Sequence, residues 1–490
     1  MQHLTSHSPS RLLRGTSAGR KRQRDAPSRR QVDDHAITVY QKSVGQDLHR
    51  SPRLQRRATQ ECKNAAGPDR SGNAVCRPGP RRKSDRMFSR MLRFLTAGES
   101  HGKALVAILE GVPSGLLIDF DAITFELRRR QGGYGRGRRM AIESDRAEAL
   151  SGIRHGLTTG APIALLIPNK DWENWQKTMY SEHEQPADAT GADRPTVTRP
   201  RPGHADLAGV VKYGHDDIRN VLERASARET AARVAVGAIA RQLLRRLGTD
   251  IVSHVVSIGS VAVADPLALT YDDVRAIQPD GPLHCADAAV EQRMIAEIDA
   301  ARDAGDTMGG SFEVIAHEVP AGLGSYVQWD RKLDGRLAQA MMSIPAIKAV
   351  GIGRGPAVAS LPGSRIHDEI LPPSPPSGRT VGVSRPTNNA GGLEGGVTNG
   401  EDLRVTGYMK PIATLMKPLR SVDLTTMLES PAAVERSDVC AVPAAAVVGE
   451  AMVAIVLADA AIEKFGADSV DEIVANWQAF SARTAARFRR

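Results

Sequence analysis

The alternation of apolar and polar positions from residue 91 onward predicts a series of short strands and helices. Apolar runs bounded by glycine or proline predict buried strands, and β-branched residues favour the same conformation. The strands expected on this basis are 104–109, 161–167, 251–263, 311–319 and 403–409. Apolar residues at helical spacing predict helices at 121–130, 217–247, 288–304, 333–342 and 444–465.

The second half of this pattern repeats the first in outline. In the helix expected at 217–247, apolar residues from 236 to 247 keep one face, while Glu229 and Arg233 lie one turn apart on the other. Gly248 ends this helix, and a strand follows. The chain beyond it again runs through helices and strands, with no linker between the halves. The pattern therefore predicts one internally pseudo-symmetric α/β fold rather than two independent domains.

Charge divides the chain at about residue 90. The sequence has 490 residues, with 65 Lys and Arg against 56 Asp and Glu. Residues 1–90 hold 21 of the basic and 7 of the acidic residues, which leaves 44 and 49 for the rest. The positive excess therefore lies in the first 90 residues. They have few aromatics and no sustained apolar period, a composition typical of disorder.

Three interpretations of residues 1–90 stay open. A transit peptide would be rich in Arg and Ser but poor in acids, and aspartates such as Asp33 and Asp34 count against it. A nucleic-acid arm would use such charge, although no other feature supports one. We expect instead a non-native extension, with translation starting at Met91 and residues 91–490 forming one catalytic domain.

Cysteine and apolar content exclude further classes of protein. The four cysteines are too scattered for a disulfide framework, and no Cys/His spacing indicates zinc, so no metal site is expected. The longest apolar stretch, 441–462, contains Glu450 and Asp459, which argues against a membrane span. We expect a cytoplasmic protein with neither a membrane nor a nucleic-acid partner.

Two histidines stand in glycine-containing motifs. His101 lies in Gly98-Glu-Ser-His-Gly at the entry to a strand, and histidine titrates near neutral pH, as proton transfer requires. His204 lies in Arg199-Pro-Arg-Pro-Gly-His-Ala-Asp, at the end of a Pro-rich loop, 168–205, of a length that is often functional. For each motif alone, a structural role is an open alternative.

Arginines gather in two further segments. A glycine-rich loop separates Arg130 from Arg136, and guanidinium groups bind phosphate or carboxylate in bidentate fashion. A solvated loop or a nucleic-acid contact is the alternative there. The segment Arg224-Ala-Ser-Ala-Arg, in the long helix, suits a phosphate, although helical arginines more often form a solvated face.

The last segments of interest lie toward the C-terminus. The glycine-rich loop 388–396 offers several backbone N–H groups to an anion or a planar ring, or it is a plain surface loop. Lys410-Pro-Ile-Ala-Thr follows it. Asp438, beside Arg436, would stay ionised and act as a base or proton relay, or it would form an ordinary ion pair at a helix start.

Taken together and in this order, the motifs resemble those of the chorismate synthase family. The resemblance runs from Met91 to about Phe480. Its most specific segments are GESHG (98–102), RPGHAD (201–206), RASARETA (224–231), GDTMGG (305–310), NNAGGLEGG (388–396), KPIAT (410–414) and RSDVCAVPAA (436–445). The chain departs from the family at 351–356, where acidic residues are common.

The resemblance implies a β-α-β sandwich (α+β) that assembles as a homotetramer. It also implies a carbon–oxygen lyase that converts 5-enolpyruvylshikimate 3-phosphate to chorismate, the last common step toward the aromatic amino acids. The reaction is a 1,4-anti elimination of phosphate and a proton, and it needs reduced FMN without net redox change. An external flavin reductase or NADPH would supply the reduced flavin.

The resemblance also implies roles for individual residues. His101 would assist phosphate departure as a proton donor, His204 would control flavin protonation, and Asp438 would assist proton removal through the flavin. Arg130 and Arg136 would bind the anionic substrate or, alternatively, NADPH. The implied FMN contacts are Arg224, Ala225, Ser226, Pro345, Ala346, Gly395, Lys410, Pro411, Ile412, Ala413, Thr414 and Arg436.

Two other classes of protein remain as alternatives. A flavin oxidoreductase with a true NADPH site would oxidise NADPH rapidly without the shikimate ester. A nucleic-acid-binding protein that keeps only the scaffold would bind DNA through residues 1–90 with a steep dependence on salt.

Overall fold

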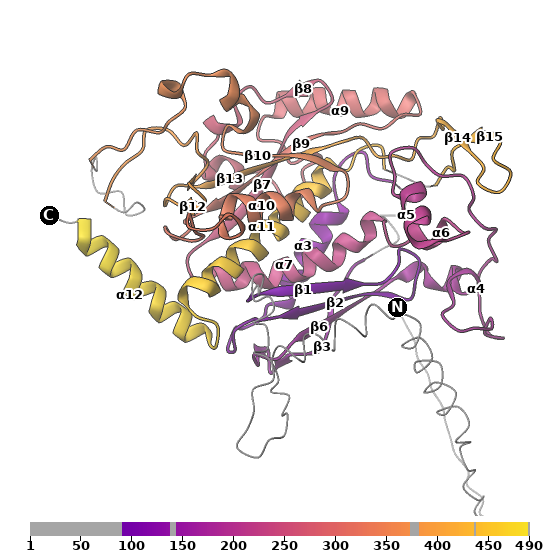
Figure 1. Cartoon of the computed structure of the whole chain (residues 1–490), viewed down its shortest axis with the longest axis horizontal. Helices are drawn as coiled ribbons and strands as arrows, with labels where there is room; N and C mark the ends of the chain where they lie inside the picture. The colour runs from indigo at the N-terminus through magenta and orange to yellow at the C-terminus, as the bar shows by residue number, and fades with distance from the viewer. Residues whose placement is uncertain (1–90, 138–143, 373–381, 436–437, 489–490) are drawn as a thin grey trace, which may run out of the picture. The chain divides into compact units, whose positions relative to one another are not determined.

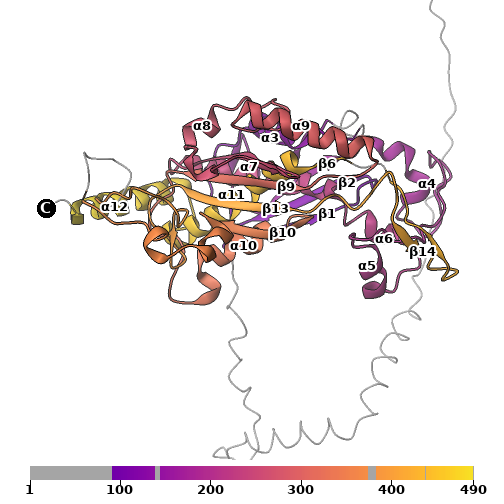
Figure 2. The ribbon, with the colours of Figure 1, turned by 90° about the horizontal axis from the view of Figure 1, so that it is seen from above.

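The computed structural model describes residues 91–137, 144–372, 382–435 and 438–488, which Figure 1 draws in colour. The expected extension, 1–90, lies outside the described residues. The described elements form two antiparallel sheets with helices packed between them, as both views show (Figures 1 and 2).

Four strands form the first sheet, in the spatial order β1-β2-β6-β3 with antiparallel neighbours. They are β1 (Arg93–Ala97), β2 (Ala104–Glu110), β3 (Glu148–Ser151) and β6 (Ile163–Pro168). Every second residue of β2 and β6 is buried, for example Leu105 opposite Ile167, because successive side chains point to opposite faces. This sheet therefore packs one face against the core.

Five strands form the second sheet, in the order β10-β13-β9-β7-β8, again antiparallel. They are β7 (Asp250–Ile258), β8 (Val261–Ala262), β9 (Gly310–His317), β10 (Ile347–Ile352) and β13 (Leu403–Met409). Nearly every residue of β9 and β13 is buried, as expected of central strands covered on both faces. Helix α11 (Val442–Phe465) contacts the inner face of this sheet, and α9 (Ala288–Asp303) lies along its outer side (Figure 1).

The helices between the sheets are α3 (Phe120–Gln131), α7 (Thr230–Arg245), α10 (Leu333–Met342) and α11. Helix α7 packs on the first sheet, α11 packs on the second, and the two helices contact each other. A Cβ on Gly237 of α7 would lie 2.3 Å from the Cβ of Ala451 on α11, so only glycine allows this spacing. The expected sandwich is confirmed in its α+β form, and each half of the chain supplies one sheet and one long buried helix.

The other elements lie around this sandwich. The small strands form the hairpins β4 (Ile153–Arg154) with β5 (Leu157–Thr158), β11 (Leu393–Glu394) with β12 (Val397–Thr398), and β14 (Arg420–Val422) with β15 (Glu429–Pro431). The remaining helices are α4 (Gln176–Met179), α5 (Asp206–Tyr213), α6 (Arg219–Leu222), α8 (Tyr271–Arg275) and α12 (Val470–Phe488). Helix α12 extends away from the sandwich (Figures 1 and 2), and of its residues only Val470 and Ile473 are buried.

The single strand expected at 251–263 is wrong, because the structure divides it into β7 and β8, which pair as a hairpin. Most of the other predicted elements are confirmed, but the single helix expected at 217–247 is also wrong. The structure divides it into α6, a 3-10 helix at Ala227–Glu229, and α7. Ser226 has extended backbone angles, and its Oγ accepts a hydrogen bond from the N–H of Arg228. A serine that caps its own following turn interrupts a helix in this way. The Pro-rich stretch 168–205 is also not wholly irregular, because it contains α4 and a 3-10 helix at Lys170–Asn174.

Helix α11 is long and apolar enough to cross a membrane by composition, yet its apolar window is wholly buried in the fold. Two acidic residues of this helix, Glu450 and Asp459, are also buried and form ion pairs with arginines. Arg241 Nη1 lies 2.7 Å from Glu450, and Arg336 Nη2 lies 2.5 Å from Asp459. Helix α11 is therefore a core helix of the described structure.

Candidate active site

The candidate site lies at the end of the sandwich that carries α5, α6 and the β14–β15 hairpin (Figure 1). The turn between β1 and β2 carries His101, and the loop before α5 carries His204. The segment that begins at Arg224 leads into the N-terminus of α7. The hairpin packs on the His204 loop, where Ser421 Oγ donates a hydrogen bond to the carbonyl of Pro200 at 2.6 Å.

A buried carboxylate holds His101. Its Nδ1 lies 2.9 Å and 3.0 Å from the two oxygens of Glu223, and its backbone N–H donates to Glu223 Oε2 at 2.9 Å. The imidazole stacks on Trp175 with ring centroids 3.8 Å apart. Next to it, Ser100 Oγ accepts a hydrogen bond from Ser226 Oγ at 3.1 Å. The turn thus brings His101 beside one of the expected flavin contacts.

A second buried carboxylate holds His204. Its Nδ1 lies 2.5 Å from Asp206 Oδ1. Burial would raise the pKa of Asp206, but hydrogen bonds from His204 and Arg201 hold that pKa well below its usual range. Arg201 also donates to Thr414 Oγ1 at 2.9 Å. This contact joins the His204 loop to the Lys410–Thr414 segment.

Arg130 is buried at the C-terminal end of α3. Its guanidinium donates to Asp145 and to Thr230, each at 3.3 Å, and Asp145 also accepts from Arg228 at 2.6 Å. Burial lowers the pKa of Arg130 to about 10, and the charges of Arg228 and Arg136 act in the same direction while Asp145 opposes them. Arg130 Nε is buried without a hydrogen-bond partner among the described residues. An anionic ligand would stabilise this guanidinium.

Asn169 connects the Arg130 cluster with the turn that carries His101. Its Oδ1 accepts from Arg228 Nε at 2.9 Å, and its Nδ2 donates to the carbonyls of Glu99 at 3.1 Å and Gly102 at 2.7 Å. One hydrogen-bonded chain therefore runs from Arg130 to both sides of His101.

Arg136 and Asp438, far apart in the sequence, form an ion pair of 2.7 Å. The N–H of Gly137 also donates to Asp438 Oδ1 at 2.7 Å. The structure thus brings two predicted site residues together, in an ion pair that the sequence pattern did not predict. The proton-relay role of Asp438 stays a prediction. Arg436 lies outside the described residues.

The Lys410–Thr414 segment lies beside two other motifs. Thr307 Oγ1 donates to the carbonyl of Ile412 at 2.7 Å, and the N–H of Lys410 donates to the carbonyl of Ala346 at 3.0 Å. Ala346 has a φ of 69°, a strained angle of the kind that clusters at functional sites. Burial, and then the charge of Lys348, lowers the pKa of Lys410. Two neighbouring ammonium groups fit an anionic group, such as the phosphate of the expected FMN.

Of the remaining expected flavin contacts, Gly395 lies apart from the others. Arg224 donates to the carbonyl of Thr96 at 2.9 Å, and Ala225 follows it at the same end of the sandwich. Pro345 follows the end of α10, directly before Ala346. Gly395 lies at the other end of α10, because its neighbour Gly396 accepts from the N–H of Leu333, the first residue of that helix. A helix of this length spans about 15 Å, so one copy of the chain does not bring Gly395 to the others.

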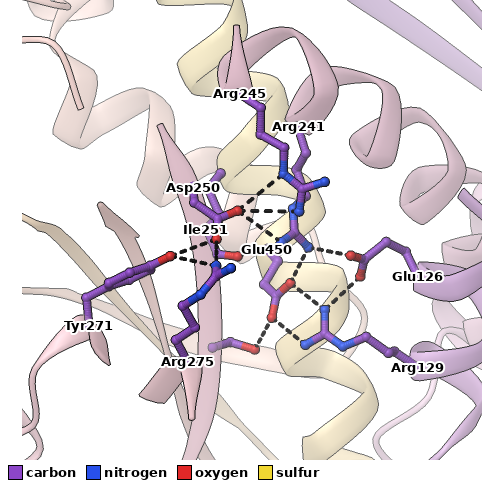
Figure 3. A network of polar contacts seen from close by, with 10 residues as sticks. Glu126, Arg129, Arg241, Arg245, Asp250, Ile251, Tyr271, Arg275 and Glu450 are labelled. Atoms are coloured by element: carbon purple, nitrogen blue, oxygen red, sulfur yellow. Dashed lines mark hydrogen bonds and ion pairs between the residues drawn. The ribbon is translucent and has the colours of Figure 1, made fainter. Parts of the chain in front are cut away.

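Arg129, one residue before Arg130, belongs to a different cluster, the buried network that Figure 3 shows. Its guanidinium donates to both oxygens of Glu450, at 2.7 Å and 2.8 Å, and to Glu126 at 2.7 Å. Arg241 donates to the same two glutamates at 2.7 Å each. Burial would lower the pKa of Arg129, but Glu450 and Glu126 raise it above its usual value. This network fixes the last turn of α3 and, through it, the start of the glycine-rich loop.

Comparison with known proteins decides the family. The family model described as chorismate synthase matches residues 92–462. The chain belongs to the chorismate synthase family. Curated members of this family are named for their enzyme activity, which makes the chain a carbon–oxygen lyase that acts on a small-molecule substrate in the biosynthesis of aromatic compounds.

Individual relatives agree with this assignment. The chorismate synthase of Moorella thermoacetica is 58% identical over 378 residues, which cover 77% of this chain and 95% of that protein. The chorismate synthase of Desulforudis audaxviator is 55% identical over 393 residues, with 80% and 98% covered. A solved crystal structure of a chorismate synthase is 42% identical, with a TM-score of 0.64, and covers 81% of this chain and 98% of that one.

Sequence reasoning missed several residues that the structure brings into the site. Two of them stand beside predicted residues, since Asp206 comes two positions after His204 and Glu223 directly precedes Arg224. That adjacency is a signal that could have been used. The others have no local signal, because they reach the site only through the fold; they are Asp145, Asn169 and Trp175.

Proposed function

We propose that the chain converts 5-enolpyruvylshikimate 3-phosphate to chorismate by a 1,4-anti elimination of phosphate and a proton, with reduced FMN as its cofactor. The observation that carries the proposal is the hydrogen-bonded chain that runs from the buried guanidinium of Arg130 through Asp145, Arg228 and Asn169 to the turn that carries His101. The substrate has two carboxylates and a phosphate, and such groups suit guanidinium donors. The buried Nε of Arg130, which has no partner among the described residues, favours an anion at this place.

Each polar group has a proposed part in the reaction. Arg130 and Arg136 bind the anionic groups of the substrate, although the phosphates of NADPH would suit the same guanidinium groups. His101 donates a proton from Nε2 to the oxygen of the departing phosphate. His204 holds or releases a proton beside the flavin ring, and Asp438 assists removal of the ring proton of the substrate.

The FMN would be held by the Arg224–Ser226 segment and by the Lys410–Thr414 segment with its neighbour Ala346. The Arg224–Ser226 segment and Ala346 would contact it, and Lys410 would pair with its phosphate. When bound, reduced FMN supplies electron density that favours departure of the substrate phosphate. The protein side of this chemistry is to bind both anions, to exclude water and to present the histidine nitrogens.

We further propose a cytoplasmic homotetramer that receives its reduced flavin from an external reductase. The separation of Gly395 from Ala346 supports an oligomer, since a neighbouring copy could supply the missing contact. NADPH stays the alternative reductant.

An anaerobic assay tests the proposed reaction. Purified protein, dithionite-reduced FMN and 5-enolpyruvylshikimate 3-phosphate should give equal amounts of phosphate and chorismate, and omission of FMN should abolish both. Rapid NADPH oxidation without the ester, and no chorismate, would instead favour a flavin oxidoreductase.

Two histidine variants test the proposed roles within that assay. His101→Ala and His204→Ala should each lower turnover by about 10²- to 10⁴-fold while FMN binding persists. His204→Ala should also change the shape of the pH–rate profile, because reduced flavin ionises near neutral pH. An unchanged profile at reduced amplitude would leave His204 with a positioning role only.

A further inference from the structure

Glu223 makes more contacts to His101 than a simple ion pair needs. Its two carboxylate oxygens lie 2.9 Å and 3.0 Å from Nδ1, and Oε2 also accepts the backbone N–H of His101 at 2.9 Å. The backbone carbonyl of Glu223 accepts the N–H of Ser100 at 3.1 Å. The Glu223 side chain is 1% exposed. One residue therefore fixes both the backbone and the ring of the histidine.

These contacts determine which nitrogen of the imidazole can exchange a proton with a ligand. A carboxylate only accepts hydrogen bonds, so the proton on Nδ1 points at Glu223. Nε2 is then the nitrogen that exchanges a proton with a ligand. Which nitrogen of a histidine is protonated is set by the hydrogen bond that the other nitrogen makes.

Trp175 fixes the plane of the same ring. The indole and the imidazole stack at 3.8 Å with 18° between their planes. The guanidinium of Arg194 lies 3.8 Å from the indole ring, and the indole N–H donates to Asp171 at 3.0 Å. Trp175 is 6% exposed. The stretch between β6 and α5 thus contributes a rigid wall against His101.

Glu223 also stands next to the expected flavin segment, since Arg224, Ala225 and Ser226 follow it directly. Arg219, one turn earlier in α6, lies 3.7 Å from its carboxylate. A short stretch of chain therefore carries the group that orients His101 and the groups expected to contact the flavin.

We propose that Glu223 is a positioning residue that holds His101 as the Nδ1–H tautomer, and that Trp175 holds the plane of the ring. The proposal rests on the proposed function. In the reaction, the imidazolium gives its Nε2 proton to the oxygen of the departing phosphate and remains as the neutral ring with its Nδ1–H on Glu223. Neither Glu223 nor Trp175 touches the reacting atoms.

A double-mutant comparison tests the proposal. Glu223→Gln keeps the size of the side chain, but its amide can also donate to Nδ1 and so allows the other tautomer. We expect turnover to fall by at least about tenfold, and by no more than the roughly 10²- to 10⁴-fold loss expected for His101→Ala. KM and FMN affinity should change little. In the His101→Ala background, Glu223→Gln should cause no further loss, because residues that act through one group are not additive.

Further variants separate positioning from folding. Glu223→Asp keeps the carboxylate and should recover part of the turnover. Trp175→Phe should retain more turnover than Trp175→Ala, because it keeps a ring against the imidazole. Glu110→Gln, at an exposed ion pair at the far end of β2, is the matched control and should behave as wild type.

An NMR measurement keeps the proposal testable even without turnover. The ¹⁵N shifts of the neutral His101 ring in wild type should report the Nδ1–H tautomer, and Glu223→Gln should lose that signature. The proposal is overturned if wild type shows the Nε2–H tautomer, or if Glu223→Gln is as active as wild type. It is also overturned if Glu223→Gln costs the same in both backgrounds. Absence of chorismate formation by wild type, with the tautomer as expected, would instead contradict the proposed function.

Discussion

Arg129 and Arg130 are neighbours in the sequence and differ sharply in their surroundings. Arg129 faces Glu450 and Glu126, and these carboxylates raise its pKa despite burial (Figure 3). Arg130 shares Asp145 with Arg228, and burial lowers its pKa to about 10. Carboxylates of the protein balance the charge of Arg129. Arg130 shares one carboxylate with a second arginine, so net positive charge remains where we propose that a substrate binds.

Neighbouring arginines in this segment therefore have different roles, Arg129 in stability and Arg130 in the proposed binding of substrate. Side chains on successive helix positions point about 100° apart, so Arg129 turns toward α7 and α11 while Arg130 turns toward Asp145. The network around Arg129 connects α3, α7 and α11. It therefore anchors the helix end from which Arg130 reaches the site.

Removing Glu450 should lower the stability of the protein, because it disrupts the network around Arg129. Glu450→Ala leaves Arg129 and Arg241 buried with one carboxylate fewer, and such losses typically cost about 3–5 kcal/mol. Chemical denaturation should show this decrease in the free energy of unfolding. The folded fraction should keep a KM near that of wild type; a large rise in KM with unchanged unfolding would contradict the assignment of Glu450 to stability.

Low pH should weaken the same network over a defined pH range. Burial would raise the pKa of Glu450, but Arg129 and Arg241 lower it to about 2, against 4.5 in the unfolded chain. The unfolded state therefore binds more protons between these values, so this stabilisation is complete above pH 4.5 and is lost as the pH falls toward 2. The expected loss is on the order of 3 kcal/mol. Unfolding measured from pH 5 to 2.5 should show a shallower slope for Glu450→Gln than for wild type.

Removing Arg130 should have its main effect on binding. Arg130→Ala deletes a charged donor whose loss typically costs about 1.5–3 kcal/mol, or roughly 10- to 150-fold in substrate affinity. The free energy of unfolding should change little, because Asp145 keeps its contact with Arg228. Arg128→Ala, exposed on the same helix turn, is the matched control. A loss of FMN affinity alone would move Arg130 to the cofactor site.

Deleting residues 1–90 should have the smallest effect. We expect unchanged turnover, FMN affinity and oligomeric state, because the motifs of the family begin after Met91. Assay and size-exclusion chromatography of the shortened and full chains give the comparison. A shortened protein that purifies only as inactive aggregate would show that the first 90 residues take part in folding.

The sequence predicted the regular elements well where periodicity was strong. The bounds of α10 and β13 agree with the prediction, because each is a clear apolar pattern with turn residues at its ends. The break before α7 was missed because Ser226 acts through its backbone conformation, which helical periodicity does not reveal. Helix α12 was missed although Val470, Ile473, Val474 and Trp477 stand at helical spacing, so this omission was not forced by the sequence.

The candidate site was predicted in part for similar reasons. Motifs identified His101 and His204, but the carboxylates that orient them were not assigned. Asp145 and Asn169 meet the site from separate loops, and only the fold determines that meeting. Local patterns therefore identify groups that carry chemistry more readily than the groups that hold them in place.

The contact between Gly237 and Ala451 has a consequence for how the chain can be divided. Each half of the chain contains one sheet. The central helices α7 and α11 nevertheless lie so close together that a methyl group added at Gly237 would clash with Ala451. Neither helix can bury its apolar surface without the other. The halves should therefore unfold in one cooperative transition, and a chain cut in the turn after α7 should yield two fragments that acquire stable structure only when mixed.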